Sequence, residues 1–141
     1  MSAGCAAPFP ADPDGTLQRV ESGVLRVGVS PNETWSGFED GEGVGREAQL
    51  VRGFADALAA EVRWREGGEE QLMEAVEAGE LDLVIGGLTD ATPWSTHAAM
   101  TRPYTESVDE TGRTVRHVMA VPLGENAFLT ELETYLEEAA P

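Results

Sequence analysis

The sequence predicts an α/β domain with a mostly parallel sheet and helices on both faces of that sheet. Strand-sized apolar segments alternate with segments of helical periodicity, which is typical of parallel sheets whose connecting helices cover the faces. The segment Leu81–Gly86 is apolar except at Asp82, as expected for a strand that is buried on both sides. An antiparallel strand pair is expected near the C-terminus.

The first half of the domain contains two predicted strands, separated by a loop and a helix. Val24–Ser30 is rich in valine and alternates in polarity, which indicates a strand. Pro31–Gly45 contains Asp-Gly and further glycines, which are typical of a hairpin or loop. Arg46–Ala60 has apolar residues at helical spacing, and Glu61–Glu66 is the second predicted strand.

The second half continues the alternation and then changes it. Glu69–Gly79 is predicted to be a helix, with its glycine where helices commonly end. Thr92–Ala99 is predicted to be a short helix. Tyr104–Val108 and Val115–Pro122 are the expected antiparallel strands, and Glu125–Ala139 is the last predicted helix.

Two regions are expected: residues 1–22 as a flexible linker and residues 23–141 as a single lobe. The linker carries the only cysteine of the chain, Cys5. The small residues before Cys5 resemble the lipobox of bacterial lipoproteins, in which this cysteine is lipid-modified, although Ser2 stands where that pattern prefers leucine. Two interpretations stay open, a lipid-anchored tether and a plain tail.

The chain is strongly acidic, with 26 acidic residues, 9 basic residues and a net charge of −17. Proteins that bind nucleic acids or anionic membranes present basic surfaces to them. The charge therefore argues against both kinds of partner.

The sequence offers little support for an enzyme, and we expect no cofactor and no metal. The histidines, His97 and His117, lie far apart in the chain, and neither has a second histidine or a cysteine at metal-ligand spacing. The glycine run Gly41–Gly45 matches no phosphate-binding motif, and neither a nucleophile elbow nor a zinc-protease motif is present.

Ligands of open α/β sheets bind outside the carboxyl ends of the strands. In this chain three segments follow the predicted strands of the sheet: Ser30–Trp35, Glu66–Glu69 and Gly87–Trp94. We therefore expect a ligand site at that edge.

Several segments resemble the bacterial extracellular solute-binding proteins of family 3. Leu25–Ser30 and Gly45–Glu47 fit the start of that family's pattern. Leu72–Thr89 is similar to its "A-L-x-x-G-x-x-D-x-x-x-x-G-x-T" segment, and Thr101–Tyr104 to its "S-x-P-Y". The resemblance implies a lobe of the periplasmic-binding-protein type.

Proteins of this family have two lobes that close on a ligand. Here only the ten residues 105–114 separate Tyr104 from Val115, and the segment from Val118 resembles the family's return into the first lobe. The resemblance thus implies one lobe, with a short turn in place of the second.

The resemblance also implies where an amino acid would bind. Family members hold its carboxylate with the threonine of "G-x-T", nearby backbone N–H groups and an arginine a few residues later. Thr89 and Gly87 match the threonine and the glycine, but Trp94 stands near the place of the arginine. An amino acid or a small amine is the expected ligand. The expected site residues are Ser30, Trp35, Gly87, Thr89, Thr92, Trp94 and Tyr104.

Two functions follow from these expectations. The first is an extracytoplasmic small-solute-binding protein, like the substrate-binding component of an amino-acid-type ABC transporter, located in the periplasm or at the cell surface. Because one lobe cannot enclose a ligand, this reading implies weak binding or a homodimer. The alternative is a ligand-free interaction module that docks on a membrane permease or another envelope protein.

Overall fold

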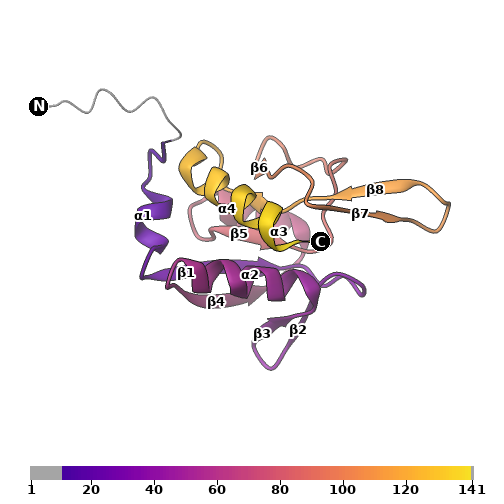
Figure 1. Ribbon diagram of the computed structural model, residues 1–141, viewed down its shortest axis with the longest axis horizontal. Helices are drawn as coiled ribbons and strands as arrows, with labels where there is room; N and C mark the ends of the chain where they lie inside the picture. Colours follow the sequence, from indigo (N-terminus) through magenta and orange to yellow (C-terminus); the bar gives the residue numbers. More distant parts are fainter. Residues whose placement is uncertain (1–10, 141) are drawn as a thin grey trace, which may run out of the picture.

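The computed structural model describes residues 11–140, which form four helices, a five-stranded sheet and two hairpins (Figure 1). The helices are α1 (Thr16–Val20), α2 (Arg46–Ala57), α3 (Glu69–Glu77) and α4 (Asn126–Ala139). The sheet strands, in spatial order, are β4 (Glu61–Glu66), β1 (Val24–Val29), β5 (Leu83–Ile85), β9 (Ala120–Val121) and β6 (Ala99–Met100). The hairpins are β2 (Gly37–Glu39) with β3 (Glu42–Val44), and β7 (Thr105–Val108) with β8 (Thr114–His117).

The sheet is mostly parallel, as predicted. Strands β4, β1 and β5 run in the same direction, and Val27 of β1 lies between Trp64 of β4 and Leu83 of β5. Strand β9 runs antiparallel to both of its neighbours, β5 and β6. The carboxyl ends of β4, β1 and β5 therefore lie at one edge, called the carboxyl edge below.

Helices cover both faces of the sheet, which confirms the predicted fold class. On one face, α2 and α4 pack through Phe54 and Phe128 against the valines of β1, and Figure 1 shows these two helices on the same side. On the other face, α3 contributes Leu72 and Val76 to a second cluster with Val84 of β5. Because β5 is buried on both faces, its consecutive residues are all apolar.

Two predictions from the sequence were wrong in detail. The segment Thr92–Ala99 is not a helix: Trp94 O accepts hydrogen bonds from the N–H groups of His97 and Ala98, and the chain then enters β6. The predicted strand Val115–Pro122 is divided into β8 and β9. The chain leaves the hairpin after His117 because its next residues pair with the central sheet instead of with β7.

The predicted linker also ends earlier than expected. Helix α1 lies inside residues 1–22, yet Val20 is fully buried in the core. The hydroxyl of Thr16 donates a 2.6 Å hydrogen bond to the buried carboxylate of Glu125, at the start of α4. Ordered packing therefore begins before residue 23, while Cys5 lies outside the described residues.

The hairpin β7–β8 contains residues 105–114, which the family resemblance puts in the place of a second lobe. Figure 1 shows it projecting away from the body of the molecule. No helix in the described part of the chain is long and apolar enough to span a membrane.

Candidate functional site

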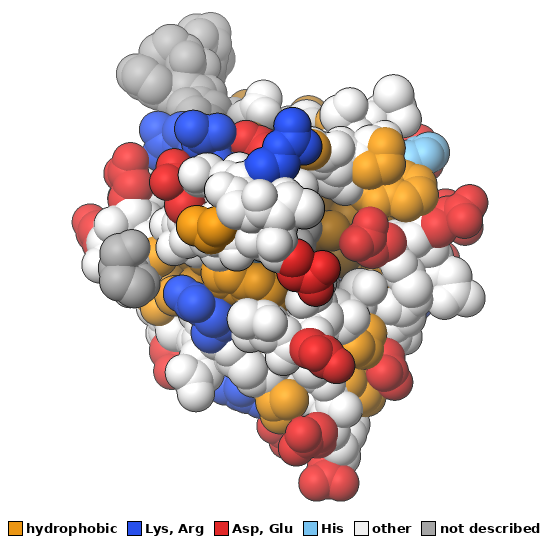
Figure 2. Space-filling view, turned by 90° about the vertical axis from the view of Figure 1, so that its right-hand side faces the viewer, with side chains coloured by type: hydrophobic (Ala, Val, Ile, Leu, Met, Phe, Trp, Pro, Cys, Tyr) orange, Lys and Arg blue, Asp and Glu red, His pale blue; other side chains and the backbone are white. Residues whose placement is uncertain are grey.

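The carboxyl edge gathers the loops that follow β1 and β5. The N–H of Ser30 donates a 2.9 Å hydrogen bond to the carbonyl of Ile85, which holds the two strand ends together. Gly87 has a φ of +69°, and a Cβ there would lie 2.6 Å from the Asn32 amide nitrogen, so the turn after β5 requires glycine. Figure 2 looks onto this side of the molecule and shows acidic side chains over much of it, with apolar side chains across the middle.

Glu47, in the first turn of α2, fixes the turn after β5. Its side chain is fully buried, and one carboxylate oxygen accepts hydrogen bonds from the N–H groups of Gly86 (3.2 Å) and Gly87 (2.8 Å). The other oxygen accepts a hydrogen bond from the Tyr104 hydroxyl. Burial raises the pKa of Glu47, whereas these hydrogen bonds oppose that shift. The carboxylate thus joins α2, β5 and the segment before β7.

An aromatic stack lies beside this carboxylate. Trp35 is 7% exposed and stacks on the imidazole of His117 with ring centroids 3.7 Å apart. The guanidinium of Arg46 lies 4.4 Å from the centre of the Trp35 ring, within the range of a cation–π contact. The Nε2 atom of His117 is 2.7 Å from the Ser107 hydroxyl, while its buried Nδ1 has no hydrogen-bond partner among residues 11–140. Burial lowers the pKa of His117.

Thr89 is joined to the stack through the backbone. It forms an isolated antiparallel bridge with His117, in which Asp90 N donates to Arg116 O and Val118 N to Leu88 O. The Thr89 carbonyl accepts a 3.0 Å hydrogen bond from Thr92 N, which closes the next turn. Within residues 11–140 the N–H of Thr89 donates no hydrogen bond. This N–H is therefore free for another acceptor.

Trp94 lies apart from these groups. Its indole N–H donates a 2.8 Å hydrogen bond to Glu69, the first residue of α3, and its ring packs on the cluster formed by α3. Tyr104 instead packs on the opposite face of the sheet, with α2 and α4. Trp94 and Tyr104 are thus separated by the sheet.

Of the seven predicted site residues, five lie in one neighbourhood and Thr92 follows it in the next turn. The five are Ser30, Trp35, Gly87, Thr89 and Tyr104. Four further residues, which were not predicted as site residues, complete this neighbourhood: Arg46, Glu47, Ser107 and His117. For Arg46 and Glu47 the available signal was their place in the segment Gly45–Glu47, which resembles the family's pattern.

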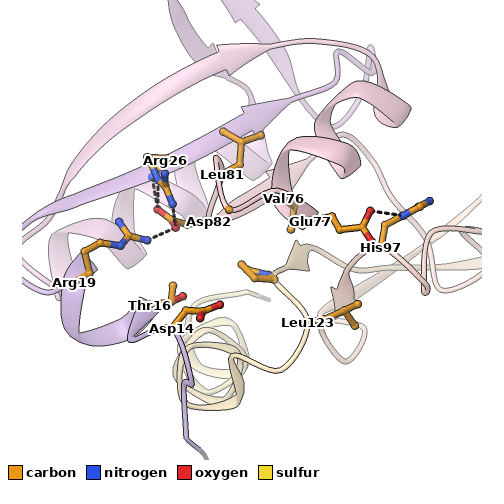
Figure 3. Close-up of a pocket in the computed structure, with 12 residues that line it drawn as sticks. Asp14, Thr16, Arg19, Arg26, Val76, Glu77, Leu81, Asp82, His97 and Leu123 are labelled. Atoms are coloured by element: carbon orange, nitrogen blue, oxygen red, sulfur yellow. Dashed lines mark hydrogen bonds and ion pairs between the residues drawn. The ribbon is translucent and has the colours of Figure 1, made fainter.

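A hollow of about 340 Å³ lies at the opposite edge of the sheet (Figure 3). Arg19 and Arg26 both point at the buried carboxylate of Asp82, and His97 faces Glu77 at 2.9 Å. An anion entering this hollow would compete with Asp82 for both arginines. Among the described residues, no group of three His, Cys, Asp or Glu side chains is placed to hold a metal ion.

Comparison with known proteins agrees with this geometry. The sequence profile of the bacterial extracellular solute-binding proteins, family 3, matches residues 25–140. The chain belongs to this family. None of the curated protein sequences matches it significantly.

Solved structures show the same fold as this family-3 lobe. The arginine-bound form of domain 1 from TmArgBP has a TM-score of 0.73 at 21% identity, with 86% of this chain and 97% of that chain covered. An ancestral cationic amino acid solute-binding protein has a TM-score of 0.73 at 14% identity, covering 87% and 93%. The L-cystine solute receptor of Neisseria gonorrhoeae, unliganded and open, has a TM-score of 0.70 at 12% identity, covering 86% and 89%. This chain therefore has the fold of a single solute-binding lobe.

Proposed function

We propose that this lobe binds a small solute at the carboxyl edge, as the substrate-binding component of an amino-acid-type ABC transporter does. The observation that supports this most is the free N–H of Thr89 beside the Trp35–His117 stack. Family membership implies a place in the periplasm or at the cell surface. We also propose that Cys5 carries a lipid that anchors the protein to a membrane.

The buried carboxylate of Glu47 gives this edge its fixed shape. Burial of a carboxylate costs several kcal/mol unless hydrogen bonds compensate it, by order of magnitude. Here the Glu47 carboxylate accepts three hydrogen bonds, from the N–H groups of Gly86 and Gly87 and from the Tyr104 hydroxyl. The turn that leads to Thr89 is thereby held before any ligand arrives, which lowers the entropy lost on binding.

A ligand at this edge would be covered on one side only. Binding by one such lobe has a precedent in the arginine-bound form of domain 1 from TmArgBP, a protein of the same fold. Because one lobe buries less of the ligand than two, we expect weaker binding than in a closing two-lobe protein.

The test is a thermal-shift and calorimetric screen against amino acids, amines and small osmolytes. A solute that binds the folded state should raise the melting temperature with dose. Thr89→Ala should weaken that binding by about fivefold or more, because it removes the hydroxyl beside the free N–H. Thr130→Ala, on the exposed side of α4, is the matched control and should bind as the parent does.

A flat response to every solute would contradict solute binding. It would favour the second candidate, an interaction module that docks on an envelope or membrane partner. The observation in favour of this candidate is the projecting hairpin β7–β8, where Val108 is 67% exposed.

A further inference from the structure

We infer that strand β4 pairs with the β4 strand of a second copy of this chain, in antiparallel orientation, and so forms a homodimer. The surface is the outer edge of β4 (Glu61–Glu66), which is one end of the five-stranded sheet and has six residues. The other end of the sheet is β6, which has only two residues and offers little to pair with. The inference uses none of the residues assigned to the solute site and is therefore independent of the proposed function.

The outer edge of β4 carries backbone groups that nothing in residues 11–140 pairs with. Glu61 N–H donates to Gly23 O at 2.8 Å, and Gly67 N–H donates to Val29 O at 3.1 Å. In the parallel register of β1 and β4, the backbone groups of the residues between these ends therefore alternate, and those of Val62 and Trp64 point away from β1. Their N–H and C=O groups make no other hydrogen bond in the described part of the chain. Such an edge is a template for another strand.

The side chains of β4 carry charge on one face and apolar groups on the other. Val62 and Trp64 pack against the core formed with α2 and α4. Glu61, Arg63 and Arg65 alternate with them and are exposed on the opposite face. Within residues 11–140, Glu61 and Arg63 form no ion pair, and Arg65 forms an exposed one with Glu80 at 3.3 Å. The edge thus presents both signs of charge to an incoming strand.

One antiparallel register matches both faces of the strand to a second copy. It places Val62 opposite Trp64 of the copy, so that the outward backbone groups of these residues exchange hydrogen bonds. On the other face Glu61 then stands opposite Arg65 of the copy, and its carboxylate lies diagonally beside Arg63 of the copy. Because the dimer has two-fold symmetry, each of these favourable pairs occurs twice. Arg63 faces its own copy at the centre, which is the one unfavourable pair.

The neighbouring registers fit less well. Placing Trp64 opposite Trp64 puts Arg63 opposite Arg65 in both halves of the dimer, and like charges in that position are destabilising. Placing Val62 opposite Val62 leaves Arg65 beyond the paired part of the strand. The charge pattern of β4 therefore favours the register that pairs Val62 with Trp64.

The surroundings of the edge leave room for a second strand. A hollow of about 590 Å³ borders β4 between Val62 and the tip of the β2–β3 hairpin, which Figure 1 shows on the same side of the molecule. The interface is small and each copy has a net charge of −17, so we expect a weak dimer. Antiparallel pairing directs the carboxyl edges of the two copies in opposite directions, so neither copy covers the solute site of the other.

The first experiment is analytical ultracentrifugation of the full chain at protein concentrations from about 1 μM to 1 mM, where weak interfaces associate. The parent should shift from monomer to dimer over this range. Val62→Pro removes an outward N–H but none of the hydrogen bonds to β1, as an edge strand tolerates, and should stay monomeric. The matched control is Val108→Asp, on the exposed end of β7, which should dimerise as the parent does.

A charge exchange tests the pairing of Glu61 with Arg65. Glu61→Arg should raise the dissociation constant of the dimer by about tenfold, because a like-charge contact replaces an ion pair twice. Arg65→Glu should weaken the dimer in the same way. The double variant Glu61→Arg/Arg65→Glu restores opposite charges and should recover most of the parent's affinity, which a purely structural effect of either change would not produce.

Crosslinking tests the register directly. The variants are made in a Cys5→Ser background, because Cys5 is the only cysteine of the chain. Arg63→Cys should form a disulfide-linked dimer on mild oxidation, since residues facing each other in a pair without hydrogen bonds have Cα atoms about 4.5 Å apart. Glu61→Cys is the control and should stay monomeric, because four residues along a strand separate it from its own copy by about 13 Å.

Three results would overturn the inference. A parent that stays monomeric at the highest concentration shows that the edge does not pair with a second copy. A Val62→Pro variant that dimerises like the parent, with a native circular dichroism spectrum, shows that the dimer uses another surface. Crosslinking of Val62→Cys but not of Arg63→Cys shows that the register is wrong. None of these results bears on solute binding, which the thermal-shift screen tests separately.

Discussion

Trp35 stacks on His117 at a centroid distance of 3.7 Å and an interplanar angle of 31°. The contact joins the loop after β1 to the last residue of β8. It therefore connects the parallel sheet to the hairpin that lies in the place of a second lobe. The proposed solute site depends on this connection, because Thr89 pairs through its backbone with His117.

The stack should contribute to stability through both burial and ring contact. Trp35→Ala should lower the free energy of unfolding by about 3 kcal/mol, as for other buried aromatic residues. Trp35→Phe keeps a ring against His117 and should lose about 1 kcal/mol. Urea denaturation measures both, and equal losses in the two variants would show that the stacking contact is unimportant.

His117 should make stability depend on pH. Because burial lowers its pKa in the folded state below the ordinary 6.5, the unfolded chain binds the proton more readily. The stability that neutral His117 contributes is fully present above pH 6.5, and it is lost as the pH falls through the lowered pKa of the folded state. Urea denaturation across this pH range should show that the free energy of unfolding falls less in His117→Gln than in the parent. An identical pH dependence in both proteins would contradict this assignment.

Glu47 should give the opposite pH dependence. Its pKa in the folded state is raised above the ordinary 4.5. The stability that protonated Glu47 contributes is therefore fully present below pH 4.5 and is lost as the pH rises through the raised pKa. Glu47→Gln should remove this loss, while the amide oxygen still accepts from Gly86 and Gly87. Glu47→Ala leaves these N–H groups and Tyr104 unpaired, and should cost about 3 kcal/mol at neutral pH. Urea denaturation of the two variants at several pH values is the measurement.

Asp82 should be the most sensitive charge at the opposite edge. It is 1% exposed and pairs with Arg19 and Arg26, so Asp82→Ala should cost about 2 kcal/mol or more, because it leaves the partly buried Arg26 without its partner. The matched control is Glu42→Ala, which breaks an exposed ion pair with Arg52 and should cost about 0.5 kcal/mol or less. Thermal unfolding of both variants compares them, and equal losses would contradict a structural role for Asp82.

Trp94 should act in packing more than in ligand binding. Trp94→Phe loses the hydrogen bond to Glu69 but keeps an aromatic ring against α3, so we expect a loss of about 1 kcal/mol. The affinity for any solute found in the screen should stay within about twofold, a change of under 1 kcal/mol. A large loss of affinity in calorimetry would place Trp94 in the site after all.

The regular elements of this lobe could be predicted because they are encoded locally. Apolar periodicity placed β1, β4, α2, α3 and α4 to within a few residues, and the apolar run identified β5 as buried. The prediction from local sequence patterns was wrong where pairing with distant strands determines the path of the backbone. His117 pairs with β7 while Ala120 pairs with β5, and no local signal separates these two residues.

The fold class, the acidic character, the family resemblance and the edge at which a ligand is expected all follow from local patterns in the sequence. Which side chains meet at that edge depends on how distant segments pack together. Trp35 and Trp94 look alike as loop aromatics, yet Trp35 stacks on His117 and Trp94 donates its indole N–H to Glu69 of α3. Likewise, the burial of Glu47 and the contact of Arg46 with Trp35 depend on residues distant in the chain. Strand and helix periodicity reports which face of an element is buried, whereas a site depends on contacts between elements.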